Sequence, residues 1–80
     1  MKIDGYIAVR KDGVSLGYES TEIEARRGAQ TYEFNHLPED IRIEAISHGD
    51  AFLNREIQKF DVEEHGWKIR PIKFVFIDEE

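Results

Sequence analysis

The clearest pattern in this chain is the alternation of apolar and polar residues over positions 67–77. In an extended strand, successive side chains point to opposite faces, so Trp67 lies on the face away from its two neighbouring cations. After Pro71 the apolar residues take the other parity, and the final positions are apolar on both faces. A change of phase at a proline predicts a bulge or kink and a place at the sheet edge. We expect Phe74 and Phe76 to be buried, and Trp67 to stay accessible near the proline.

The first twenty residues predict a hairpin. Residues 3–10 read as a strand with an apolar centre, and residues 14–18 alternate as a returning strand. Between them, Lys11-Asp12-Gly13 is a strong turn signal, since Asp-Gly supplies the positive φ angles of tight hairpins.

Residues 19–25 allow two interpretations. Thr21 and Glu24 have the spacing of a helix capping box, in which the threonine oxygen and the glutamate satisfy free amide groups. The same residues also alternate as a strand would. We favour a strand that continues to about residue 25, followed by a helix over residues 26–36. Gly28 within that helix costs about 1 kcal/mol relative to alanine.

The middle of the chain predicts one more strand and one more helix. Residues 37–40 end the first helix, because Pro38 cannot continue it. Residues 41–46 alternate cleanly and predict a half-buried strand, and a turn over 47–49 follows. The apolar spacing over residues 51–60 fits a helix, with Asp50 placed to cap it.

The predicted fold is therefore α+β, in the order β-β-α-β-α-β. A mainly antiparallel sheet of about four strands would carry two helices on one face. The 80 residues fit a single compact domain, 1–80.

Composition narrows the class of protein. The chain carries 17 acids and 11 bases, for a net charge of −6, and 40% of its residues are hydrophobic. This balance is typical of a folded domain with an acidic surface. There is no cysteine, so no disulfide or thiolate metal site is expected, and we predict a reducing, cytoplasmic location. We expect neither a signal peptide nor a membrane span.

No motif indicates catalysis or a cofactor. The histidines, at positions 36, 48 and 65, fall in predicted turns or at a helix end and lack metal-binding spacing. Ser47 and His48 are adjacent, but catalytic partners meet in space with a third orienting group. Glycines are scattered and form no phosphate-binding loop. We therefore expect no enzyme activity, no cofactor and no metal.

The cations support two hypotheses of function. Lys68, Arg70 and Lys73 are interleaved with aromatic residues on the last strand, and Arg26 and Arg27 begin the first helix. Aromatics among cations on an exposed sheet are typical of proteins that stack single-stranded bases. The acidic balance of the chain opposes nucleic acid, so a nucleic-acid-associated regulator is the alternative hypothesis.

The preferred hypothesis is a small acidic protein-binding module that acts as an inhibitor, adaptor or regulatory subunit. Such compact, cysteine-free acidic proteins resemble in type the inhibitors that phages and mobile elements encode. The C-terminal edge strand would bind a partner protein or a second copy of the chain as a homodimer. For this contact we select aromatic and arginine residues, which are enriched in binding hot spots, and the basic residues of the last strand and the first helix. The predicted partner-binding residues are Trp67, Arg70, Lys73, Phe74, Tyr32, Arg26 and Arg27.

Overall fold

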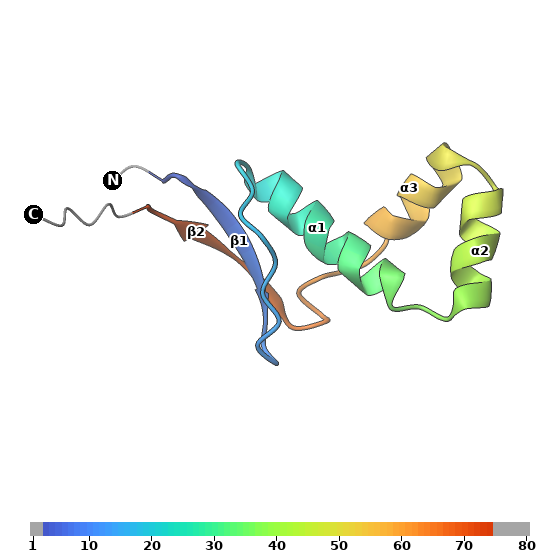
Figure 1. The fold of residues 1–80 in the computed structure, drawn as a ribbon, viewed down its shortest axis with the longest axis horizontal. Coiled ribbons are helices and arrows are strands. Elements are labelled where there is room, and N and C mark those ends of the chain that lie inside the picture. The colour runs from blue at the N-terminus through green and yellow to red at the C-terminus, as the bar shows by residue number, and fades with distance from the viewer. Residues whose placement is uncertain (1–2, 75–80) are drawn as a thin grey trace, which may run out of the picture.

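The computed structural model describes residues 3–74 and shows an antiparallel pair of strands joined to three helices (Figure 1). In chain order the elements are β1 (Gly5–Arg10), α1 (Glu22–Asn35), α2 (Glu39–Ser47), α3 (Asp50–Gln58) and β2 (Trp67–Ile72). The mixed α+β character agrees with the prediction. The predicted sheet of about four strands with two helices is wrong, because the described residues form two paired strands and three helices.

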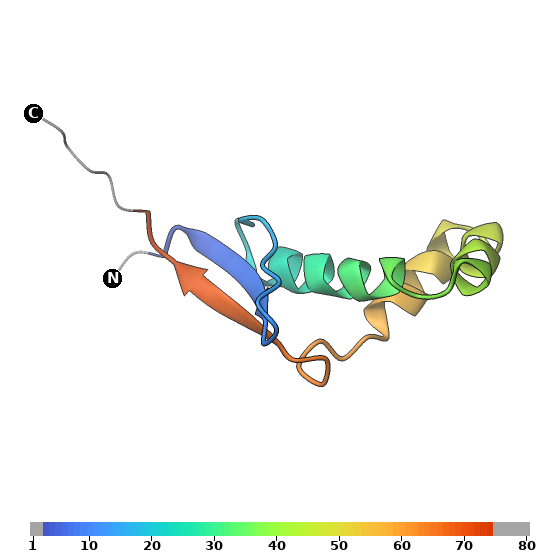
Figure 2. The same cartoon turned by 60° about the horizontal axis from the view of Figure 1, so that its bottom comes forward.

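The molecule is elongated, with principal extents of 55 × 25 × 22 Å. α1 packs on the two strands and extends away from them, so that the sheet and the α2–α3 pair lie at opposite ends of α1 (Figure 2). The Cα radius of gyration is 15.5 Å, against about 12 Å for a compact domain of this length. An elongated small chain buries less of its apolar surface than a compact one, and this leaves apolar side chains exposed.

β1 and β2 pair in a continuous antiparallel register, from Gly5 opposite Ile72 to Arg10 opposite Trp67. Pro71 lies opposite Tyr6 with no inserted residue, so the predicted bulge is wrong. The predicted edge position is confirmed within the described residues, because β2 has a paired strand on one side only. A proline is tolerated there, since an edge strand needs amide donors on one side alone.

The predicted returning strand over residues 14–18 forms only isolated bridges. The Asp-Gly turn is present, and Gly13 takes a φ of 98°. Beyond it, Val9 bridges Ser15 and Tyr6 bridges Glu19. Between these two bridges the chain advances four residues on the returning segment, from Ser15 to Glu19, but only three on β1, from Val9 to Tyr6. The extra residue breaks the register, so no continuous ladder forms.

α1 begins at Glu22, so the strand interpretation of residues 19–25 is wrong. Thr21 is the N-cap, and its hydroxyl oxygen accepts the Glu24 amide at 3.1 Å. The Glu24 carboxylate in turn accepts hydroxyl bonds from Ser20 and Thr21, both at 2.9 Å. The bond from the Glu24 amide satisfies one of the N–H groups that have no partner within the first turn of a helix. In a strand, such an amide would instead need a partner on an adjacent strand.

The predicted strand over residues 41–46 is also wrong, because this segment lies within α2. The helix starts directly after Pro38, and Glu39 and Asp40 occupy its first turn, where negative charge is favourable. With 3.6 residues per turn, Ile41 and Ala45 fall on one side and the other isoleucines on the opposite side. Among residues 3–74 no strand lies beside this segment to complete a ladder, so local helical bonds prevail.

α3 confirms the predicted helix near residues 51–60, with a different cap. Gly49, at φ 95°, takes the N-cap position, and Asp50 is the first helical residue and makes no side-chain cap bond. Residues 59–66 then return the chain to β2 through a turn that ends at Gly66, whose φ is 89°.

The core lies between α1 and one face of the sheet. It consists of Ala8, Ala29, Val62 and Trp67, which are at most 1% exposed. The expectation that Trp67 stays accessible is wrong: α1 and the loop before β2 cover it. Partly buried side chains surround this core, namely Val14, Leu16, Tyr32 and Ile69.

The end of the predicted C-terminal strand differs as well. Phe74 is 48% exposed, so the expectation that it is buried is wrong. Its ring lies 5.0 Å from that of Tyr18, and its amide donates to the Asp4 carboxylate at 2.7 Å. No helix covers this end of the sheet in the described part of the chain. The expected burial of Phe76 falls outside the described residues.

Candidate functional site

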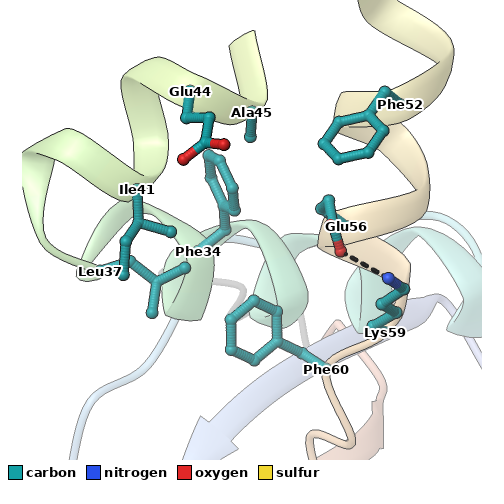
Figure 3. A pocket seen from close by; sticks show the side chains of 9 residues that line it. All are labelled: Phe34, Leu37, Ile41, Glu44, Ala45, Phe52, Glu56, Lys59 and Phe60. Atoms are coloured by element: carbon teal, nitrogen blue, oxygen red, sulfur yellow. Dashed lines mark ion pairs between the residues drawn. The ribbon is translucent and has the colours of Figure 1, made fainter. Parts of the chain in front are cut away.

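A mostly apolar hollow lies in the helical end of the molecule, where α1 ends and α2 faces α3 (Figure 3). This cavity measures about 400 Å³. We call it the helical groove. Aromatic and aliphatic side chains form most of its wall, with two glutamates and one lysine at the rim. The lining residues are Phe34, Leu37, Ile41, Glu44, Ala45, Phe52, Glu56, Lys59 and Phe60.

Local chain geometry positions these side chains. α1 ends at Asn35, and the short turn through Leu37 and Pro38 sends α2 away from it. Phe34, the last buried residue of α1, is only 4% exposed and forms the base of the groove. The glycine turn at residue 49 then brings α3 back beside α2, which places Phe52 opposite the α2 wall.

α2 carries more apolar surface than its own fold buries. Ile41 is 48% exposed and faces the groove, while Ile43 and Ile46 are 55% and 57% exposed on the other side of the helix. Full burial of such a side chain stabilises by about 1.5–3 kcal/mol. Ile41 therefore adds exposed apolar surface to the groove wall, whereas Ile43 and Ile46 form a separate exposed apolar surface on the other side of α2.

The rim of the groove is acidic. The Glu56 carboxylate is neutralised by the Lys59 ammonium at 2.9 Å. Glu44 forms no ion pair within the described residues, and Glu39 and Asp40 lie one turn away at the start of α2. An apolar floor beneath acidic residues favours a ligand with apolar anchors flanked by cations.

The predicted partner-binding residues do not form one cluster. Trp67 lies in the core, and Tyr32 is half-buried against it in an edge-to-face contact at 5.4 Å. Arg26 forms an ion pair with Glu63 at 2.6 Å, and this pairing lowers the pKa of the Glu63 carboxyl. The other four side chains are exposed: Arg27, Arg70, Lys73 and Phe74.

The groove was missed because its residues were divided between a predicted strand and a predicted helix. Ile41 and Ala45 belong to the segment that we expected as a strand, while Phe52 and Phe60 belong to the second predicted helix. A usable signal was present, since Ile41 and Ala45 have the i, i+4 spacing of a helix face.

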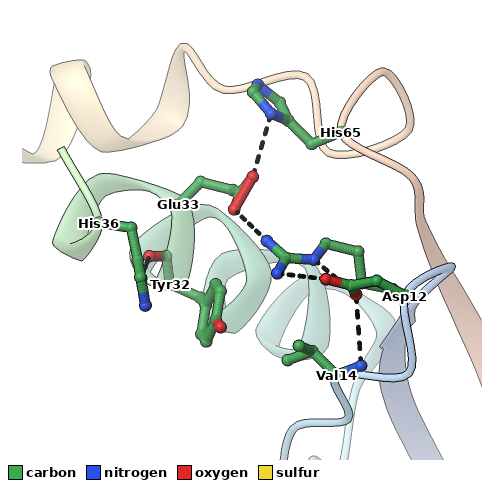
Figure 4. A network of polar contacts seen from close by, with 7 residues as sticks. Asp12, Val14, Tyr32, Glu33, His36 and His65 are labelled. Atoms are coloured by element: carbon green, nitrogen blue, oxygen red, sulfur yellow. Dashed lines mark hydrogen bonds and ion pairs between the residues drawn. The ribbon is translucent and has the colours of Figure 1, made fainter.

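A polar network joins β1 to α1 and to the loop before β2 (Figure 4). Arg10 contacts Asp12 at 2.7 Å and Glu33 at 3.0 Å, and Glu33 also contacts the His65 Nδ1 atom at 3.0 Å. The bond from Arg10 holds the pKa of the Asp12 carboxyl below its ordinary value. Arg10 also lies over the rings of Tyr32 and Trp67, at 5.0 and 5.5 Å. These contacts fasten the sheet to α1, and they hold the two carboxylates in ion pairs.

The histidines lie at positions that do not converge. His36 follows the end of α1 and His65 lies in the loop before β2, as the sequence predicted, whereas His48 follows the end of helix α2 and not of a strand. Among residues 3–74, no group of three or more histidine, aspartate or glutamate side chains has an arrangement that would hold a metal ion. None of the helices in that part of the chain has the length and apolar character needed to cross a membrane.

Comparisons of the chain with protein-family models, with curated proteins and with solved structures found no significant match.

Proposed function

We propose that this chain is a small, non-catalytic protein-binding module that docks on a larger protein through the helical groove. The observation that carries the proposal is the 400 Å³ apolar groove, whose wall includes the half-exposed Ile41 of α2. Inhibitor, adaptor and regulatory subunit are the roles that such a module fills. The cysteine-free sequence fits a reducing compartment, so we propose a cytoplasmic setting.

The chemistry of the groove defines the partner. Phe34, Phe52 and Phe60 provide aromatic walls, and Glu44 places negative charge at the rim. A partner helix with apolar residues at positions i, i+3 or i+4 and i+7, and with lysine or arginine beside them, has the matching pattern. Aromatic pockets of this kind supply most of the binding energy in helix-in-groove complexes.

The nucleic-acid alternative receives less support. Base stacking needs accessible aromatic faces beside cations. Of Trp67 and Phe74, the aromatic residues that this hypothesis placed among the cations of the last strand, Trp67 is 1% exposed and only Phe74 is accessible. Arg26 is held by Glu63. The observations on the groove therefore favour a protein partner.

A pair of isoleucine variants tests the proposal. Ile41→Glu puts a charge into the groove wall, whereas Ile23→Glu makes the same change on α1 at a side chain that is 66% exposed and outside the groove. Immobilised wild type and both variants are used to capture proteins from a lysate of the native cell, with quantitative mass spectrometry. We expect a protein that wild type and Ile23→Glu retain and that Ile41→Glu loses.

Circular dichroism and urea unfolding of both variants provide the control, because Ile41 is half exposed and its replacement should leave the helices intact. Capture of the same proteins, in equal amounts, by all three forms would contradict the proposed groove.

A further inference from the structure

A second surface lies at the opposite end of the molecule, on the strand that the sequence singled out. Hydrogen bonds show which of its main-chain groups face outward. The Lys11 amide donates to the Gly66 carbonyl at 2.9 Å, continuing the β1–β2 register by one step. Trp67 follows Gly66 by one residue, so its amide points away from β1, and it donates to the Val62 carbonyl at 3.0 Å. By this alternation the N–H and C=O of Ile69 also point away from β1.

The proline supports the same orientation. Pro71 shares the parity of Ile69, so its nitrogen, which carries no hydrogen, faces outward and no bond to β1 is lost. Beside this edge lies a hollow of about 430 Å³, which Glu22, Arg26 and Glu63 line together with residues of β2. Within β2 the edge therefore offers one free main-chain donor, the Ile69 N–H, together with outward-facing carbonyl acceptors, and these lie next to an open hollow.

Cations gather beside this edge in a chain of net charge −6. Lys68 and Arg70 line the edge hollow and also line, with Lys11, a second hollow of about 250 Å³ on the open face of the sheet. We call Lys11, Lys68 and Arg70 the strand cations. Within residues 3–74 none of the three forms an ion pair, whereas Arg10 and Arg26 each have an acidic partner.

We propose that the outer edge of β2 binds an extended acidic segment of a partner protein as an added antiparallel or parallel strand. Main-chain bonds to Ile69 would hold the segment, and acidic side chains on one of its faces would meet Lys68 and Arg70. Main-chain pairing gives a strand-adding complex its affinity, while alternate side chains give it specificity. This surface is independent of the helical groove and lies at the other end of α1, so the two together define an adaptor.

Self-pairing through the same edge is disfavoured by charge. If two copies paired antiparallel about Ile69, Lys68 of each copy would lie directly opposite Arg70 of the other. Like charges directly opposite in a sheet are destabilising. A segment rich in glutamate or aspartate reverses this interaction, which is why the acidic partner is chosen over a second copy.

The test uses fluorescence anisotropy with three labelled ten-residue peptides, in which valine alternates with glutamate, glutamine or lysine. At 50 mM salt, we expect wild type to bind the glutamate peptide most tightly. Removing two charges with Lys68→Gln/Arg70→Gln should weaken that binding roughly tenfold. Binding should also weaken at 0.5 M salt, because exposed charges are screened. The control Arg55→Glu changes the net charge by the same two units at an exposed residue of α3 and should bind as wild type does.

Two further measurements separate the competing occupants. Equal affinity for the glutamate and glutamine peptides, or tighter binding of a ten-nucleotide poly(dT) strand, would overturn the proposal. So would light scattering that shows a dimer of wild type that Ile69→Pro converts to monomer. Loss of groove binding in Ile41→Glu should leave peptide binding at β2 unchanged, so the two proposals fail separately.

Discussion

Replacing Trp67 by alanine tests whether the only tryptophan is a structural residue, as its 1% exposure indicates. Truncating a buried tryptophan to alanine costs about 3–5 kcal/mol. An 80-residue domain has a total stability of roughly 4–12 kcal/mol. The structure adds that Trp67 is the largest fully buried side chain and contacts Tyr32 edge to face. We therefore expect Trp67→Ala to lose about a quarter or more of the unfolding free energy.

The conservative variant Trp67→Phe sharpens this prediction. The indole Nε1 is buried and has no hydrogen-bond partner among the described residues. A buried unsatisfied donor costs about 1–3 kcal/mol. Trp67→Phe removes this donor, and the stability gained thereby offsets part of the stability lost with the side-chain volume. We expect this variant to lose less than half of what Trp67→Ala loses.

Urea unfolding followed by circular dichroism measures both differences. The intact protein should also show a blue-shifted tryptophan emission that iodide quenches poorly. The burial of Trp67 would be refuted if Trp67→Ala unfolded at the same urea concentration as wild type and iodide strongly quenched the wild-type tryptophan emission. Trp67 would then be solvent-accessible at the sheet edge.

Two further predictions concern helix α1 and pH. Gly28→Ala should stabilise the protein by up to about 1 kcal/mol, because a methyl group there would meet Leu16 at an ordinary 3.6 Å, and thermal melting would show a raised midpoint; a lowered midpoint would mean that the glycine is needed for close packing. Hydrogen bonds from Arg10, from Ser20 and Thr21, and from Arg26 lower the pKa values of Asp12, Glu24 and Glu63, respectively. Carboxyls with lowered folded-state pKa values stabilise the fold above their unfolded pKa values, so stability should fall as the pH drops below about 4; melting curves from pH 7 to 3 check this, and a midpoint that rises towards pH 3 would contradict it.

Part of the candidate site was accessible to sequence reasoning. The edge position of β2 followed from Pro71, and its exposed cations followed from the alternation at Lys68 and Arg70. The helical groove was not predicted, because alternating isoleucines at 41 and 43 are typical of a strand. Alternation indicates a strand only when one face is buried, and in α2 neither Ile41 nor Ile43 is buried by the described chain.

Trp67 shows the opposite error. We placed the tryptophan on the face opposite the neighbouring cations but expected it to stay accessible near Pro71, and it is buried. Which face α1 covers depends on Ala25 and Ala29, whose small side chains allow the helix to lie close to the sheet. That choice is a contact between distant segments, and no local pattern reports it.

The sequence by itself determined the features that depend on neighbouring residues. The Asp-Gly turn, the threonine cap of α1, the helix after Gly49 and the edge position of a proline-containing strand follow from backbone preferences and local hydrogen bonds. Tertiary structure decided which apolar residues are covered: Trp67 became core, Phe74 stayed exposed, and Ile41 became the wall of a groove. Burial depends on segments far apart in the chain, and with three helices and only two paired strands in the described chain, the isoleucines of α2 stay about half exposed.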